Sequence, residues 1–252
     1  MRWPLVRYVL TAAFRDRLVM ALGITIVVGA SISIFLGSAA LIEKQQFSVV
    51  FAAAGLRFAG VLGLVLFTVF FIRRSFEARD VEFILSRPVS RVEFLLSYAV
   101  GLSLLALGMS AAQGLCLYLI APHLFGIGHA WWLLSIAAEN VIMVNTALFF
   151  SMILSSAATA AMAATGFYIL ARLMGQLLGI VDAFGQPRFI YQVMEYTMQA
   201  ISAVMPRLDL AAQPSWLIYG YEGGGFFVLV QAAAFAVLVT TAALIDLVRR
   251  QF

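Results

Sequence analysis

The residues best suited to chemistry are ionisable side chains that interrupt long apolar stretches. Glu139 and Arg172 stand in the neighbouring stretches 131–154 and 157–181, roughly 12–14 Å below the same surface at about 1.5 Å rise per residue. A charged group at this depth needs a partner, so the sequence predicts a Glu139–Arg172 ion pair. The hydrogen-bonding groups expected around it are Asn140, Asn145 and Gln176. The pair is either structural or part of a substrate path or gate.

Arg57 is a third charge, in the apolar stretch 50–72. Its long side chain can either snorkel to the interface or line a cavity open to the outside. Both interpretations fit the sequence equally well.

Other residue types exclude several kinds of catalysis. Cys116 is the only cysteine, so neither an internal disulfide nor a cluster of cysteine metal ligands can form. Lys44 is the only lysine, and no glycine-rich loop ending in Gly-Lys-Ser/Thr is present to hold nucleotide phosphates. An intramembrane serine protease needs a serine and a histidine on spans at similar depth. His123 and His129 are instead expected on the surface of a short outer connection. The chain is therefore expected to hold no metal, no cofactor and no catalytic residue of its own.

The composition indicates which elements must carry these residues. Of the 252 residues, 63% are hydrophobic and 11% are charged, and the mean hydropathy is +1.01. A soluble domain is about 45–50% apolar and about 25% charged, so a soluble enzyme is excluded. About 20 apolar residues cross a bilayer as a helix, and the expected spans are residues 18–41, 50–72, 95–121, 131–154, 157–181 and 226–247. The sequence predicts an all-α polytopic membrane protein, with residues 1–252 forming a single transmembrane domain.

The distribution of basic residues predicts the orientation. Arginines occur at positions 2, 7, 15 and 17, at 73, 74, 79, 87 and 91, and at 249 and 250, whereas the opposite connections hold Lys44, Arg188 and Arg207. Cytoplasmic loops carry the excess of Lys and Arg, so both termini are expected in the cytoplasm of a multi-pass inner-membrane protein. The segment 1–17 mixes arginines with apolar residues, which predicts an amphipathic helix lying in the interface. The net charge of +4 thus reflects orientation and not nucleic-acid binding.

The long outer connection, residues 182–225, predicts a second surface helix. Between Pro187 and Pro206 apolar residues recur at helical spacing, which is typical of an amphipathic helix that lies on the outer surface or dips back into it. Just before it, Gly175 and Gly179 form a Gly-x-x-x-Gly motif. This motif either packs within the chain or lies at a subunit interface.

The cytoplasmic loop between the second and third spans has a defined pattern. Residues 75–86 fit a short helix with apolar and charged side chains, and Pro88 ends it. Ser90 and Glu93 then form a capping box that begins the third span. The residues expected to take part in this element are Phe76, Glu77, Arg79, Asp80, Glu82, Phe83, Arg87, Ser90 and Arg91.

The run Glu77-x-x-x-x-Glu82-Phe-Ile-Leu-Ser-Arg-Pro-Val-Ser-Arg-x-Glu93 resembles the coupling-helix loop of type-2 ABC exporter permeases. The six-span layout is similar too, and closest to permeases of multi-copper-enzyme-maturation systems. The stretch 204–209 resembles their outer Leu-Pro-Asn-Leu-Asp motif, although Arg207 replaces the asparagine. The motifs cover about 25 residues, while the layout covers the whole chain.

The resemblance implies a permease subunit of an exporter that works with cytoplasmic ABC ATPase subunits, which bind ATP and Mg. It further implies a second permease, identical or homologous, with membrane lipid around both. The loop helix would receive the movement of the ATPases. The alternatives are an intramembrane enzyme and an ion-coupled secondary transporter that uses Glu139.

Overall fold

The computed structural model describes residues 2–39, 43–78, 84, 89–122, 125–183, 193, 196–197, 200–201, 205–221 and 223–249. The helices are α1 (Trp3–Arg15), α2 (Arg17–Ala39), α3 (Lys44–Glu77), α5 (Arg91–Ile120), α6 (Ile127–Ile153), α7 (Ala157–Ala183), η2 (Leu208–Leu210), α9 (Ser215–Ile218) and α10 (Gly225–Arg249). Helices α2, α3, α5, α6, α7 and α10 are long and apolar enough to cross a membrane. The chain is an all-α polytopic membrane protein, as the sequence predicts.

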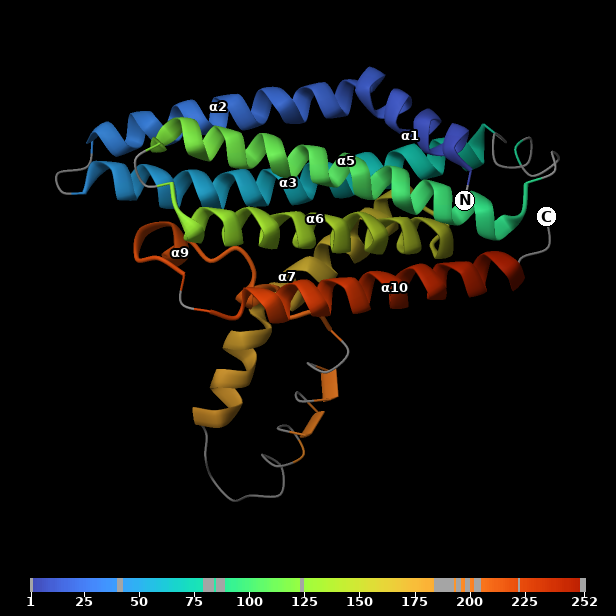
Figure 1. Ribbon diagram of the computed structural model, residues 1–252. Helices are drawn as coiled ribbons and strands as arrows, with labels where there is room; N and C mark the ends of the chain where they lie inside the picture. Colours follow the sequence, from blue (N-terminus) through green and yellow to red (C-terminus); the bar gives the residue numbers. More distant parts are fainter. Residues whose placement is uncertain are drawn as a thin grey trace.

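Helix α6 occupies the centre of the bundle. It contacts α3, α5, α7, α9 and α10, while α2 packs mainly on α3. Figure 1 shows the start of α1, the end of α3, the start of α5 and the end of α10 at one end of the bundle. By their places in these helices, Arg2, Arg73, Arg74 and Arg91 lie at this end, which is called the arginine-rich end below. Residues 205–221 lie at the opposite end and are called the closing segment below.

Helix α3 is longer than the span expected at 50–72. It continues without interruption to Glu77, because no proline or glycine follows Gly63 within it. Phe76 and Glu77, expected in a separate loop helix, are therefore the last residues of α3. Most of the expected loop helix, including Arg79, Asp80, Glu82, Phe83 and Arg87, lies outside the described residues, as does most of the outer helix expected between Pro187 and Pro206.

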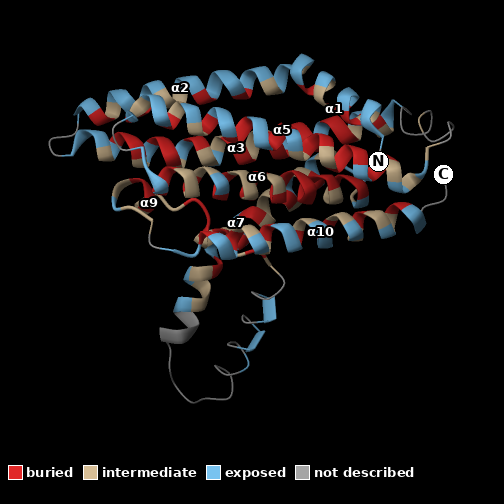
Figure 2. Cartoon of the chain, viewed as in Figure 1, coloured by how far each residue is buried: buried red, intermediate tan, exposed pale blue. Residues whose placement is uncertain are grey.

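The outward faces of the helices are apolar, and the interior holds the polar groups. Figure 2 shows the buried residues gathered between the helices and exposed residues along their outer sides. Large apolar side chains such as Phe35, Met162 and Val237 are 72%, 74% and 67% exposed. An apolar surface of this extent would cause aggregation in water, whereas lipid tails cover it at no cost.

Helix α1 is amphipathic and packs along α5. It buries Val6, Val9 and Ala13 and leaves Trp3 and Phe14 exposed. A Cβ atom at Gly101 of α5 would lie 2.9 Å from Cβ of Val9, so the glycine permits this close approach. Asp16 then separates α1 from α2, and its carboxylate accepts a hydrogen bond from the amide of Leu18 at 2.8 Å, which caps the start of α2.

The closing segment folds back onto the bundle. Trp216 and Leu217 are each 3% exposed, and Leu208, Ala211 and Ala212 are also buried. Gly128, near the start of α6, lies so close to Trp216 that a Cβ atom there would overlap the carbonyl oxygen of Trp216. The backbone contact at Gly128 therefore fixes where the closing segment rests on α6.

A Gly128→Ala substitution should loosen the closing segment. We expect it to lower the free energy of unfolding by about 1–3 kcal/mol, because overpacking forces the backbone to shift. Gly108→Ala is the matched control, since nothing lies within 4 Å of a Cβ atom there and alanine favours the helix. Thermal unfolding in detergent, followed by tryptophan fluorescence, measures both; equal effects would contradict the proposed contact.

Candidate functional site

The predicted contact between Glu139 and Arg172 is confirmed. Glu139 on α6 is fully buried, and its Oε2 lies 3.8 Å from Nη1 of Arg172 on α7. Neither carboxylate oxygen accepts a hydrogen bond within the part of the chain that the structure describes. Arg57 and Tyr168 also lie close enough to interact with this carboxylate. The pair is therefore one side of a buried polar cluster that joins α3, α6 and α7.

Arg172 also holds the closing segment. Its Nη1 donates to the carbonyl oxygens of Leu208 and Ala211, the latter at 3.0 Å. Arg57, from α3, donates to the carbonyl oxygen of Ala212 at 3.0 Å. Snorkelling and lining a cavity both stay predictions for Arg57; the structure adds that its guanidinium group donates to a backbone carbonyl of the closing segment.

The backbone at Ala212 is strained where Arg57 binds it. Its φ of 47° lies in the left-handed region, which costs a non-glycine residue roughly 1–3 kcal/mol. Charge-assisted hydrogen bonds are stronger than neutral ones, so the two arginines help to stabilise this conformation. The cluster thus couples two membrane-spanning helices, α3 and α7, to one short segment of backbone.

Asn140 belongs to a separate network. Its Nδ2 donates to Oγ of Ser110 at 2.8 Å and to Oε1 of Gln113 at 3.1 Å, and Gln113 donates to the carbonyl oxygen of Leu56 at 2.7 Å. These bonds join α6 to α5 and α3. Asn140 was expected beside the ion pair, but its side chain is hydrogen-bonded to α5. Asn145 likewise donates to Ser103 of α5.

Three polar residues of these clusters were not predicted from the sequence: Gln113, Ser110 and Tyr168. Gln113 is the only amide side chain between residues 95 and 121, and Tyr168 stands one helical turn before Arg172. Both signals were visible in the sequence: an amide in an apolar span needs partners, and residues four apart share a helix face.

Gln176, expected beside the ion pair, is exposed. Figure 1 shows why: α7 runs obliquely, and its last turns project away from the other helices. Gly175 contacts the closing segment, since a Cβ atom there would overlap the carboxylate of Asp209, whereas nothing lies within 4 Å of one at Gly179. Of the two glycines in the motif, Gly175 therefore serves packing within the chain.

Arg207, which replaces the asparagine of the outer motif, pairs with Asp209. Its Nη2 lies 2.8 Å from Oδ2 of Asp209, and these hydrogen bonds raise the pKa of Arg207 above its ordinary value. The backbone amide of Arg207 donates to Gln231 of α10 at 2.9 Å. The closing segment is thus also tied to α10.

His129 is not the surface residue expected from the sequence. It lies in α6 and is 5% exposed, with its ring centroid 5.4 Å from that of Phe125. The closing segment packs over the neighbouring Gly128, so this part of α6 is covered. Among the described residues, no group of three or more His, Cys, Asp or Glu side chains is arranged to hold a metal ion.

A second cluster lies at the arginine-rich end. The predicted capping box is present: the amide of Glu93 donates to Oγ of Ser90 at 3.1 Å, and the amide of Ser90 donates to Oε2 of Glu93 at 3.2 Å. The same Oε2 lies 3.3 Å from Nε of Arg2. The start of α5 is therefore fixed in direction and joined to α1.

Two arginines at this end bind the last carbonyl groups of other helices. Arg91 donates to the carbonyl oxygens of Leu247 and Val248 of α10 at 3.1 and 3.2 Å. Arg73, near the end of α3, donates to the carbonyl oxygens of Leu154 and Ser155 after α6, at 3.1 Å for Leu154. A helix leaves its last carbonyls without intrahelical partners, and a positive charge there is favourable.

Further contacts complete the arginine-rich end. Arg74 lies 3.4 Å from Oδ2 of Asp16, which connects α3 to the junction of α1 and α2. Phe76 is half-buried and packs against the core, while Glu77 is exposed at the end of α3. Of the two side chains, Glu77 is therefore the more accessible to another protein.

No model of a known protein family matches the chain, and no curated protein matches it significantly in sequence. Function must therefore be argued from these two clusters.

Replacing Arg172 should test the buried cluster. Arg172→Ala leaves the Glu139 charge without its partner and removes two carbonyl contacts, so we expect a loss of about 3–5 kcal/mol in the free energy of unfolding. The double variant Glu139→Ala/Arg172→Ala should lose less, because no charge stays unpaired. Gln176→Ala, on the same helix but exposed, should change stability by about 0.5 kcal/mol or less. Unfolding in detergent measures all three; equal losses in the single and double variants would rule out the coupling.

Proposed function

We propose that the chain is the membrane-spanning permease subunit of an ABC exporter in the inner membrane, with both termini in the cytoplasm. It would act with a second permease copy or homologue, and separate ATPase subunits would bind ATP and Mg. One observation carries the proposal: both sides of the loop between α3 and α5 are bonded to the ends of other spans. Arg73 before the loop binds the α6–α7 turn, and Arg91 after it binds α10.

These bonds supply a mechanical path. A partner that moves the loop also moves the start of α5, whose direction is fixed by the capping box of Ser90 and Glu93. Arg91 transmits this displacement to the end of α10, and Arg73 transmits the displacement of α3 to α6 and α7. A loop that served only to set topology would need its arginines but not these helix-to-helix bonds.

The opposite end would respond through the same helices. Helix α3 has 34 residues, roughly 50 Å at 1.5 Å per residue, and it carries Arg73 near one end and Arg57 in its other half. Helix α7 carries Arg172. Any tilt of α3 against α7 changes the spacing of the two guanidinium groups that hold residues 208–212. The closing segment would thereby open or close the outer side of a path, without covalent chemistry in this chain.

An ion-coupled carrier is the second candidate. It is favoured by Glu139, which is fully buried and whose carboxylate accepts no hydrogen bond from the described residues. Such a carrier would transport without ATP, and an intramembrane enzyme would turn over substrate as the isolated chain.

The first experiment identifies the partner. The tagged chain is purified from its native membrane, and the co-purifying proteins are identified. We expect an ATPase with a P-loop among these proteins. We also expect it to cross-link to a cysteine introduced by Glu77→Cys in a Cys116→Ser background. Purification without such a partner, together with ATP-independent uptake by vesicles that contain this chain alone, would support the carrier instead.

Arg91→Ala should break the transmission while leaving ATP hydrolysis in the complex. The readout is the rate at which a thiol reagent modifies Tyr219→Cys, a 76% exposed position in the closing segment, with and without ATP in the Cys116→Ser background. We expect ATP to change this rate in the parent and to have little effect in Arg91→Ala. Arg7→Ala, an exposed arginine of α1, is the matched control and should behave as the parent. An unchanged response in Arg91→Ala would contradict the mechanism.

A further inference from the structure

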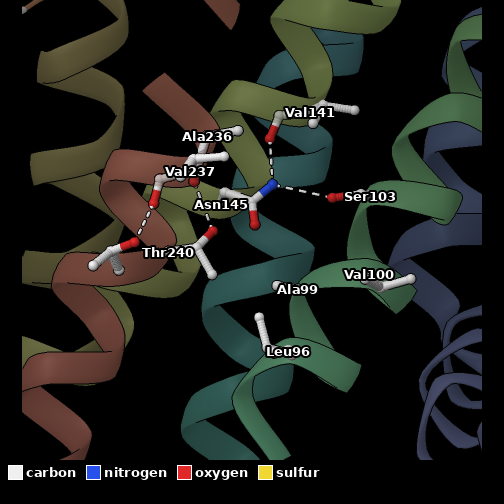
Figure 3. Close-up of a pocket in the computed structure, with 10 residues that line it drawn as sticks. Leu96, Ala99, Val100, Ser103, Val141, Asn145, Ala236, Val237 and Thr240 are labelled. Carbon is white, nitrogen blue, oxygen red and sulfur yellow. Dashed lines mark hydrogen bonds between the residues drawn. The ribbon is translucent and has the colours of Figure 1, made fainter. Parts of the chain in front are cut away.

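A groove lies between α5 and α10, with α6 as its floor (Figure 3). Its volume is about 290 Å³. The walls are mainly apolar and include Leu96 and Val100 of α5 and Val237 of α10. Leu96 is 37% and Val237 is 67% exposed, so the groove opens on the outer surface of the bundle, which faces lipid.

Small side chains produce the groove. Ala99 and Ser103 of α5 face Ala236 and Thr240 of α10 across it. Arg91 holds the two helices together at the arginine-rich end, while α10 packs mainly on α6. The space is therefore a fixed feature of how the three helices pack.

Asn145 forms the polar floor of this groove. The residue is 4% exposed, and its Nδ2 donates to the carbonyl oxygen of Val141 at 2.8 Å and to Oγ of Ser103 at 3.0 Å. Figure 3 shows the amide oxygen directed into the groove, where it accepts no hydrogen bond from any described residue. The hydroxyl groups of Thr240 and Thr241 donate to Ala236 and Val237 of their own helix, each at 2.7 Å. Oδ1 of Asn145 is thus an amide acceptor without a partner that a donor from outside can reach.

The position of Asn145 restricts what could supply that donor. It stands eight residues before Ile153, the end of α6, which places it about 12 Å from that end. Lipid headgroups lie outside this depth, and the ester-linked chains of common phospholipids carry no hydrogen-bond donor there. The volume is at the low end for ligand pockets, about 300–1,000 Å³, so it suits part of a chain and not a whole lipid.

We propose that this groove binds an apolar chain that bears a hydroxyl group, entering sideways from the bilayer and donating its hydroxyl to Oδ1 of Asn145. The apolar walls accommodate the hydrocarbon, and Asn145 selects the chain that carries the donor. An acceptor without a partner is costly in a medium without water, and the ligand removes this cost. The site does not involve the Glu139–Arg172 pair, so it stands whether or not the exporter function is correct.

Photolabelling of the full-length protein in phosphatidylcholine vesicles tests the site. The probes are a long-chain alcohol with a diazirine on its chain and the methyl ether of the same alcohol, which lacks the donor. The labelled peptides are mapped by mass spectrometry. We expect the alcohol to label the α5 and α10 residues of the groove about three- to tenfold more than the ether, which is the effect of one hydrogen bond in a membrane.

Two variants and one control separate the parts of the proposal. Asn145→Leu should abolish the preference for the alcohol, and Ala236→Phe, which fills the groove without altering Asn145, should reduce labelling by both probes. Ser31→Leu, a polar-to-leucine change on the exposed face of α2, should alter neither. Equal labelling by alcohol and ether in the parent, or a preference that survives Asn145→Leu, would overturn the proposal.

Discussion

A bilayer interior offers no water to a buried guanidinium group, so each arginine there must find its acceptors within the protein. Arg57 and Arg172 meet this requirement with backbone carbonyl groups of residues 208–212, and Arg172 also with Glu139. The consequence extends beyond these side chains. A short segment between two spans is held against the bundle and adopts a left-handed conformation at Ala212, because its carbonyls are the acceptors that the arginines need.

The same pairing of arginine with backbone carbonyl recurs at the arginine-rich end, where Arg73 and Arg91 bind the last carbonyls of α6 and α10. There the carbonyl groups are the ones that a helix end leaves without partners. Arginine suits both places because its guanidinium group carries several donors in a fixed plane and never loses its charge. Helix α3 participates at both ends, through Arg73 and Arg57, and α7 connects the two clusters through the α6–α7 turn and Arg172. Two helices, α3 and α7, therefore take part in both clusters.

Polar side chains away from the arginines follow the same rule with smaller groups. Gln113, Asn140 and Ser110 are hydrogen-bonded to one another between α3, α5 and α6, which fixes the registry of the three central helices. Oδ1 of Asn140 accepts no hydrogen bond from the described residues. Asn145 also uses its amide hydrogens, while its oxygen faces a lipid-side groove. The place of this acceptor on the lipid side, where a ligand can reach it, is the feature that sets the groove apart from an ordinary packing gap.

The sequence by itself determined the six spans, the capping box of Ser90 and Glu93, and the pairing of Glu139 with Arg172. Hydrophobic length and helix capping are local properties, and two opposite charges at equal depth in adjacent spans have few other partners. Only the tertiary structure decided what Arg57 binds, why Asn140 turns to α5, and why Gln176 is exposed. Every residue has a carbonyl oxygen, so no residue type marks the acceptor of an arginine, and the oblique course of α7 depends on packing by the whole bundle. The burial of His129 follows in the same way from the closing segment. Its position depends on contacts with Gly128, Arg57 and Arg172, which lie far from it along the chain.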